Sequence, residues 1–270
     1  MRFLYYLIFS FLIISCGDSD FVPTSASVIN KSQTPENLNK FYGANMRHLY
    51  VRVFYEPNAE PYAGKNNRDQ PVWGLLEENL KKIFEVRTQN TQVNVPKELN
   101  EMNLVTAQEK DSWTPGEIVQ FAQTLGVPPT DEASSFFTIM FLKGAYNSGD
   151  QISNSVLGVS ITGTTIIAIF KDAIRQLGPS DESLVVKFGE QATLVHEMGH
   201  ALGVVANGVD AVTEHHDQAH GAHCSNSDCV MYWQNEGNQD LLQFIQGLVT
   251  EGNKTLYGSQ CLDDIKAYSP

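Results

Sequence analysis

The alternation of hydrophobic and polar positions changes period several times along the chain. Leu49–Tyr55 alternates with a period of two, which predicts a half-buried strand. Val72–Val86 shows a helical period, and Thr91–Val95 is expected to form a further short strand. A second helix is predicted to start at Trp113-Thr114-Pro115-Gly116-Glu117, and Phe136–Leu142 is an apolar run of strand length. Strands and helices therefore alternate in the first half of the chain.

Two later segments complete the predicted fold. Val156–Phe170 is rich in β-branched residues around Gly163, which predicts two strands or one bulged strand. A long buried helix follows and ends near Gly203, with its start either beside Ser180-Asp181-Glu182 or, because Gly189 is unfavourable by about 1 kcal/mol, near Glu190. A last helical pattern covers residues 241–248. The fold class expected is α+β, with a mixed twisted sheet, this long helix and a loop-rich C-terminal subdomain.

Length and charge limit the possible classes. Once an N-terminal leader is removed, the 270 residues suit one domain, expected over residues 46–270, with an ordinary apolar content of 42%. The formal net charge of -13 repels a phosphate backbone. We therefore expect no nucleic-acid partner.

The first residues have the composition of an export signal. Arg2 precedes an uncharged apolar run from Leu4 to Ile14 that is too short to span a bilayer, so residues 1–15 are expected to be a signal peptide. The sequence Ile13-Ile14-Ser15-Cys16-Gly17 resembles the lipobox of bacterial lipoproteins. That resemblance implies an acylated Cys16, a tether over residues 16–45, and lipid anchoring in the bacterial cell envelope, at the outer membrane or cell surface.

The long helix carries a metal-binding motif, His196-Glu197-Met198-Gly199-His200. Two imidazoles four residues apart lie on one face of a helix and can bind one Zn²⁺, while Glu197 is turned toward the water that zinc binds. Zinc lowers the pKa of that water to about 7. The motif therefore predicts metal-assisted hydrolysis with Glu197 as general base.

A catalytic zinc needs a third protein ligand, and one segment offers several candidates. His215, His216, Asp217, His220 and His223 all lie between Thr213 and His223. The residues themselves do not select one of them. The remaining histidines are expected either to be solvated or to bind a second ion or shape substrate access.

The whole pattern, His196 to Gly203, then His223-Cys224, four residues and Cys229-Val230-Met231, resembles the metzincin zinc peptidases and, within them, the archaemetzincins. In that family the third histidine follows the glycine by three residues, where this chain has Ala206 and an inserted segment before His223. The resemblance implies a metzincin-like domain with one catalytic Zn²⁺ held by His196, His200 and His223, and with Met231 beneath the metal. It also implies peptide or protein substrates that bind along an edge strand drawn from Val156–Phe170.

Two alternatives stay open. Asn235-Glu236-Gly237-Asn238-Gln239-Asp240 fits the outline of the gluzincins, in which a glutamate, here Glu236, is the third ligand. A non-catalytic zinc-binding surface lipoprotein is the second alternative, although a purely structural site has no need of Glu197. Tyr232 and Tyr257 are expected to be structural and not to stabilise an oxyanion.

Beyond Cys16 the chain has three cysteines, Cys224, Cys229 and Cys261, an odd number for an exported protein. Archaemetzincins bind a second, structural zinc with four cysteines, but the downstream Cys-x-x-Cys that this needs is missing here, so a second zinc of that type is not expected. A disulfide between Cys224 and Cys229 is expected instead, with pairing of either to Cys261 as the alternative.

Overall fold

The computed structural model describes residues 33–66, 69–128, 131–180, 183–236, 241, 244, 245 and 255–270. The expected signal peptide, Cys16 and the first half of the expected tether lie outside the described residues, as does most of the helix expected over residues 241–248. Among the described helices, none combines the length and the apolar character needed to cross a membrane.

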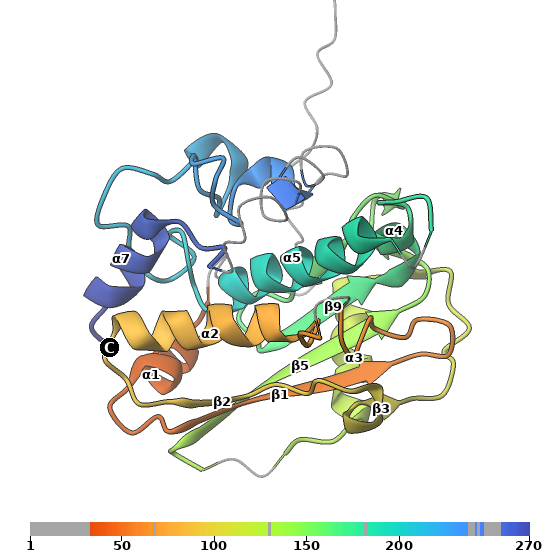
Figure 1. Ribbon diagram of the computed structural model, residues 1–270, viewed down its shortest axis with the longest axis horizontal. Coiled ribbons are helices and arrows are strands. Elements are labelled where there is room, and N and C mark those ends of the chain that lie inside the picture. Colours follow the sequence, from red (N-terminus) through yellow and green to blue (C-terminus); the bar gives the residue numbers. More distant parts are fainter. Residues whose placement is uncertain are drawn as a thin grey trace, which may run out of the picture.

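A mixed sheet forms the centre of the molecule (Figure 1). Its strand order is β2-β1-β5-β9-β8, and β3 also pairs with β1. All neighbours are parallel except β8 and β9, which are antiparallel. The strands are β1 (His48–Tyr55), β2 (Gln92–Asn94), β3 (Asn103–Leu104), β5 (Ser134–Leu142), β8 (Gly158–Ser160) and β9 (Ile166–Phe170).

The position of β5 in the middle of the sheet explains the apolar run at Phe136–Leu142. In β5, Phe137, Ile139, Met140 and Phe141 are all fully buried, so both faces of this strand are covered. A parallel strand buried on both faces has a continuous apolar sequence in place of an alternating one. The strand predicted over Phe136–Leu142 is thereby confirmed and extended to Ser134.

The segment Val156–Phe170 forms two strands and not one bulged strand. Strands β8 and β9 are joined by a turn in which Gly163 has a φ of +72°, a conformation that glycine adopts without strain. Because β8 is the last strand in the order, its outer edge has no strand partner among the described residues. An exposed edge of this kind can pair with an extended peptide.

Helices cover both faces of the sheet (Figure 1). Helices α2 and α5 contact each other across one face, and α3 lies behind the sheet against β9. Helix α7 packs against α2 near the end of the chain. The helices are α1 (Pro35–Tyr42), α2 (Gly74–Val86), α3 (Pro115–Thr124), α4 (Lys171–Arg175), α5 (Leu184–Ala201) and α7 (Ser259–Ala267).

The rest of the chain has little regular structure. A small second sheet consists of β4 (Ser112–Trp113), β6 (Ala145–Asn147) and β7 (Ile152–Ser153). After α5, the described elements before α7 are the 3₁₀ turns η2 (Gln218–His220) and η3 (Trp233–Glu236), and an earlier turn, η1, covers Leu99–Glu101. Leu241, Phe244 and Ile245, the described residues of the helix expected over residues 241–248, are helical. The predicted α+β class with a mixed sheet, a long helix and a loop-rich C-terminal part is confirmed.

Helix α5 begins at Leu184, so a start near Glu190 is excluded. The Ser183 hydroxyl caps the helix by accepting a hydrogen bond from the backbone N–H of Val186 at 3.3 Å. Gly189 does not interrupt the helix because it is a packing position. A Cβ there would lie 2.4 Å from Cδ1 of Leu177, so only glycine admits that side chain.

Candidate metal centre

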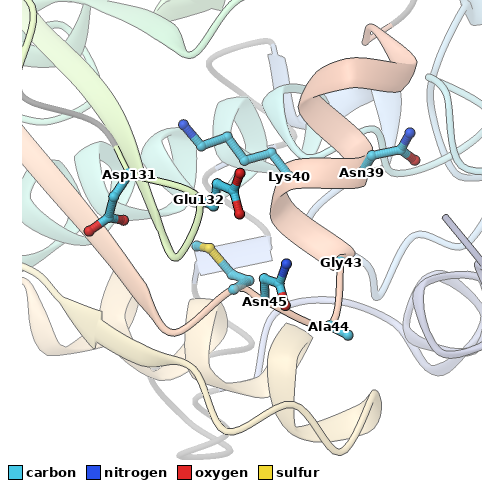
Figure 2. A pocket seen from close by; sticks show the side chains of 8 residues that line it. Asn39, Lys40, Gly43, Ala44, Asn45, Asp131 and Glu132 are labelled. Carbon is cyan, nitrogen blue, oxygen red and sulfur yellow. The ribbon is translucent and has the colours of Figure 1, made fainter.

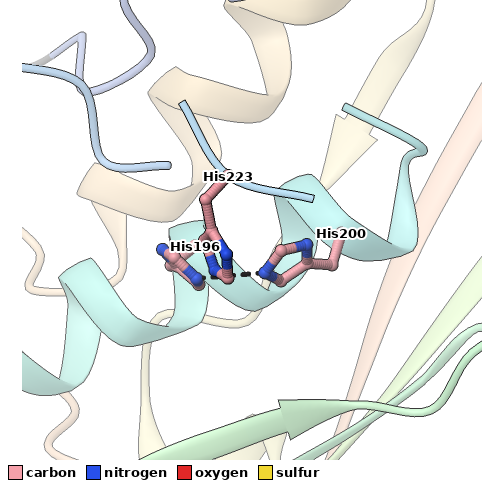
Figure 3. Close-up of side chains that lie close together, drawn as sticks. All are labelled: His196, His200 and His223. Atoms are coloured by element: carbon pink, nitrogen blue, oxygen red, sulfur yellow. Dashed lines mark hydrogen bonds between the residues drawn. The ribbon is translucent and has the colours of Figure 1, made fainter. Parts of the chain in front are cut away.

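Three histidines from two distant segments meet beside α5 (Figure 3). His196 and His200 lie one helical turn apart, and their Nε2 atoms are 3.0 Å apart. His223 comes from the irregular segment after the helix, and its ring centroid lies 5.3 Å from that of His196 and 5.0 Å from that of His200. One ligand atom from each histidine lies within 4.8 Å of the others. The three imidazoles therefore converge on one point.

Backbone carbonyls fix the orientation of two of these rings. Nδ1 of His196 lies 2.7 Å from the Val230 carbonyl oxygen, and Nδ1 of His223 lies 2.5 Å from that of His220. A carbonyl oxygen only accepts, so both rings donate from Nδ1, which leaves Nε2 with the lone pair that binds a metal. Asn235 donates to the same Val230 carbonyl at 3.2 Å and holds it in place.

The end of α5 is fixed around His200. Gly203 has a φ of +80° and donates to the His200 carbonyl at 3.0 Å, while Val204 donates to that of Gly199, which is a Schellman motif. The side chain of Gln33 donates to the Ala201 carbonyl, and that of Tyr42 to the Leu202 carbonyl. The turn that carries His200 is therefore held by hydrogen bonds from several parts of the chain.

Met231 packs directly under the histidine turn. Its side chain is fully buried, and a Cβ at Gly199 would lie 2.3 Å from the Met231 sulfur. Gly199 separates His196 from His200, so the absence of a side chain there lets the methionine approach the metal-binding turn from below. This contact explains why a residue of low helix propensity stands in the middle of the motif.

We expect Gly199→Ala to lower the free energy of unfolding by about 1–3 kcal/mol, because the new methyl group must displace a buried side chain. Chemical denaturation of the metal-free protein would measure this without a contribution from metal binding. The matched control is Gly116→Ala in α3, where a Cβ would meet nothing within 4 Å. Equal unfolding free energies for the two variants would show that Met231 moves aside freely.

Glu197 faces a small cavity between α5 and the edge strand. The cavity has a volume of about 90 Å³, and its lining includes Glu197, His196, Thr193, Gly158 and Tyr146. A Cβ at Gly158 would lie 3.1 Å from Cγ of Glu197, so glycine lets strand β8 run close to this carboxylate. A carboxylate beside converging imidazoles is the arrangement that the helical motif predicts.

Tyr146 reaches the same cavity from strand β6. Burial, and secondly the negative charge of Glu197, raise the pKa of the Tyr146 phenol above its ordinary value, so its hydroxyl stays protonated at neutral pH. The sequence does not predict that this phenol lies in the cavity, because nothing in the chain order relates residue 146 to residue 197.

The other candidate histidines lie apart from this group. His220 is exposed, bonded through Nδ1 to Asp217 at 2.8 Å and stacked on Trp233 with ring centroids 3.8 Å apart. Nε2 of His216 faces the Gly221 carbonyl at 2.6 Å. His215 is buried and lies beside Cys224 and Asp264. The inserted segment is therefore a folded loop with one inward-facing histidine at each end.

Among the described side chains, the group that converges beside α5 consists of the three histidines and includes neither Tyr257 nor Tyr232. The hydroxyl of Tyr257 is buried and donates to the Val195 carbonyl at 2.7 Å, which gives this residue a structural role. Tyr232 lies half-buried next to Trp233, with ring centroids 6.2 Å apart. The side chain of Glu236 lies outside the described part of the structure.

The described cysteines, Cys224, Cys229 and Cys261, are free thiols in the structure. The sulfur of Cys224 faces His215, and that of Cys229 faces Cys261 at 3.5 Å. The structure does not contain the expected disulfide between Cys224 and Cys229.

A larger hollow of about 690 Å³ lies elsewhere, between the end of α1 and the start of β5 (Figure 2). Most of its lining side chains are exposed, among them Asn39, Asn45, Asp131 and Glu132. Binding sites usually combine a buried apolar wall with a few converging polar groups. The hollow has no such wall, and the histidine cluster is the better candidate for function.

No protein-family model matches the sequence, and no curated protein matches it. Among solved structures, a zinc-dependent peptidase from Methanocorpusculum labreanum (strain Z) is similar to this chain, with 10% sequence identity and a TM-score of 0.43. The match covers 80% of this chain and 99% of that chain. In the described part of this chain, two groups of side chains could bind a metal: His196, His200 and His223, and His215, Cys224 and Cys261.

Proposed function

We propose that this chain is a zinc-dependent endopeptidase. The observation that carries the proposal is the convergence of His196, His200 and His223 next to Glu197, at a cavity bordered by an edge strand. Three protein ligands with a neighbouring carboxylate are what a catalytic zinc site requires, whereas a structural site closes all four positions with protein ligands.

The donor set fits zinc. Zinc–nitrogen bonds of about 2.0–2.1 Å place two tetrahedral ligands about 3.4 Å apart, close to the 3.0 Å between Nε2 of His196 and Nε2 of His200. The hydrogen bonds from Nδ1 of His196 and His223 to backbone carbonyls orient these rings so that Nε2 faces the point of convergence. Zinc held by these residues supplies a Lewis acid that polarises the substrate carbonyl and lowers the pKa of water.

Glu197 is the proposed general base and acid. Its carboxylate accepts a proton from the water that attacks the peptide carbonyl carbon, and it returns a proton to the amide nitrogen as the carbon–nitrogen bond breaks. The narrow cavity beside Gly158 limits the space around this carboxylate. Tyr146, which lines the same cavity and stays protonated, is available as a hydrogen-bond donor to the substrate.

The substrate is proposed to lie along β8 in extended conformation. The outer edge of β8 has no strand partner among the described residues, and Gly158 and Val159 of this strand line the cavity that contains Glu197. Main-chain hydrogen bonds to an edge strand bind a peptide independently of its side chains. This placement favours an internal segment of a polypeptide over a small molecule as substrate.

Two finer parts of the proposal rest on the sequence. Met231 under the histidine turn and the order of the motifs support a metzincin-type, archaemetzincin-like peptidase. The leader and Cys16 support a lipid-anchored protein of the bacterial cell envelope, which would act on peptides or proteins at the outer membrane or cell surface.

Cleavage of a peptide library, read by mass spectrometry, tests the activity. We expect the zinc-loaded protein to cleave peptides within the chain, to lose this activity with a chelator and to regain it when zinc is restored. Cleavage that persists without metal would contradict a zinc mechanism. Absence of cleavage by fully zinc-loaded, folded protein would favour the alternative of a non-catalytic zinc-binding lipoprotein.

A further inference from the structure

A second cluster of metal-binding side chains lies in the core of the C-terminal part. His215, Cys224 and Cys261 are all buried, and their ligand atoms lie within 4.8 Å of one another. Nδ1 of His215 lies 3.4 Å from the Cys224 sulfur and 4.0 Å from that of Cys261. The sulfur of Cys229 lies 3.5 Å from that of Cys261. One imidazole and two thiols therefore share one buried place, and the Cys229 thiol adjoins it through Cys261.

These spacings correspond to those around a tetrahedral zinc ion. With zinc–sulfur bonds of about 2.3 Å and zinc–nitrogen bonds of about 2.0 Å, two sulfurs lie about 3.8 Å apart and a sulfur and a nitrogen about 3.6 Å apart. A disulfide instead requires about 2.0 Å between sulfurs. The distances of 3.4 and 4.0 Å from His215 to the sulfurs of Cys224 and Cys261 are compatible with a shared metal, and the 3.5 Å between the sulfurs of Cys229 and Cys261 is too long for a covalent bond.

Asp264 of α7 supports the histidine from its other side. Nε2 of His215 lies 2.6 Å from a carboxylate oxygen of Asp264, and both side chains are fully buried. The other carboxylate oxygen accepts a hydrogen bond from the backbone of Val212 at 2.8 Å. A carboxylate that binds the far nitrogen of a histidine is the usual outer partner of a metal ligand, because it fixes the ring and makes the near nitrogen more basic.

Backbone N–H groups also point at two of the sulfurs. Gly258 donates to the Cys229 sulfur at 3.1 Å, and Asn226 to the Cys224 sulfur at 3.5 Å. A Cβ at Gly258 would lie 3.2 Å from Cβ of Cys229, so glycine allows this approach. Hydrogen bonds of this kind stabilise sulfur in its thiolate form, the form that binds metal.

We propose that His215, Cys224, Cys229 and Cys261 bind a second, structural zinc ion. This set differs from the four-cysteine set of the archaemetzincins because the inserted segment supplies a histidine as fourth ligand. The sequence argues only against a second zinc of the four-cysteine type, because the downstream Cys-x-x-Cys is missing, and it leaves open that a histidine of the inserted segment binds a second ion. His215, Cys224 and Cys229 lie in the irregular segment after α5, whereas Cys261 lies in α7, so a shared metal would join this segment to α7.

If this proposal holds, the structural zinc positions His223, the third ligand of the proposed catalytic zinc. Cys224 directly follows His223, and its backbone N–H donates to the Met231 carbonyl at 2.7 Å. The Ser225 N–H donates to the His215 carbonyl at 2.8 Å, which closes the inserted segment into a loop. Binding of Cys224 to a metal would therefore fix both His223 and Met231.

Cobalt substitution tests this site without reference to activity. The full chain would be prepared reduced, with His196→Ala and His200→Ala together to disable the first cluster. We expect it to bind about one Co²⁺ per chain, with a thiolate-to-cobalt charge-transfer absorption in the near ultraviolet. His215→Ala in this background should lose that absorption, and His215→Cys should restore it by completing a four-thiolate set. His216→Ala, a neighbouring histidine whose ring faces the Gly221 carbonyl, is the matched control.

A measurement on the unaltered chain complements the variants. It should contain about two zinc ions, and a mercurial that blocks thiols should release about one of them while the other stays bound. Cobalt binding without charge transfer, an unchanged spectrum in a folded His215→Ala protein, or a native disulfide found by thiol counting would each overturn the proposal.

Discussion

Glu197→Gln is expected to lower kcat for peptide cleavage by about 10²–10⁴-fold while the protein keeps its zinc. Glutamine has nearly the same shape as glutamate, so it preserves the close contact with Gly158, whose hypothetical Cβ would lie 3.1 Å from Cγ of residue 197. It has no carboxylate to accept a proton from water. Because the imidazoles of His196, His200 and His223 are unchanged, metal affinity should stay near that of the parent.

The measurement is the cleavage rate of one library-derived peptide at matched zinc content. Glu214→Gln provides the control, because this carboxylate is exposed in the inserted segment. It should leave kcat unchanged. If Glu197→Gln retained the parental kcat with zinc bound, proton transfer would have to be assigned to another group, and Tyr146 in the same cavity would be the first to examine.

The local part of this site could be predicted from the sequence. His196, Glu197 and His200 stand in one helix, and helical geometry alone places the two imidazoles on one face. The start of that helix was harder to predict, because Gly189 looks unfavourable by propensity. Glycine stands at this position because Leu177, which precedes the helix in the chain, packs against it. Propensity could not show this contact, since tertiary packing overrides it.

The non-local part could not be predicted in the same way. The segment holds five residues that are equally good metal ligands by type. Only the resemblance to a family pattern indicates His223 as the third ligand. In the structure, hydrogen bonds to backbone carbonyls distinguish the histidine that faces α5 from those that do not. The His220 carbonyl turns His223 toward α5, whereas His216 and His220 face the loop itself or the solvent.

The environment of His215 could not be predicted from the sequence at all. In the sequence it belongs to a histidine-rich loop and was expected to be solvated or to bind an additional ion. It is buried against Asp264, a residue 49 positions further along the chain. Helix α7, which carries both Asp264 and Cys261, was not predicted because it is short and has few apolar residues. Without that helix, the partners of His215 and of Cys229 could not be identified, and a disulfide was the natural expectation.

His223→Ala is expected to weaken zinc binding by the cluster of His196, His200 and His223 by more than about 100-fold. Loss of a residue that only hydrogen-bonds to a metal ligand typically weakens metal binding by about 10–100-fold, and loss of a ligand itself should cost more. The variant removes one of three ligands and leaves His196 and His200 alone on the helix. Peptide cleavage should fall with it. His220→Ala should keep zinc and most of the activity, because the bond that orients His223 comes from the backbone carbonyl of residue 220, which alanine retains.

Zinc content after dialysis against a competing chelator would compare the two variants, with the expected loss of about one zinc ion per chain only for His223→Ala. The reverse result, loss in His220→Ala and retention in His223→Ala, would reassign the third ligand to His220. Because Cys224 adjoins His223, the cobalt–thiolate absorption of the second cluster should be recorded in the same proteins. If it persists in His223→Ala, the lost ion came from the histidine cluster, and if it disappears, the two clusters fold as one unit and depend on each other.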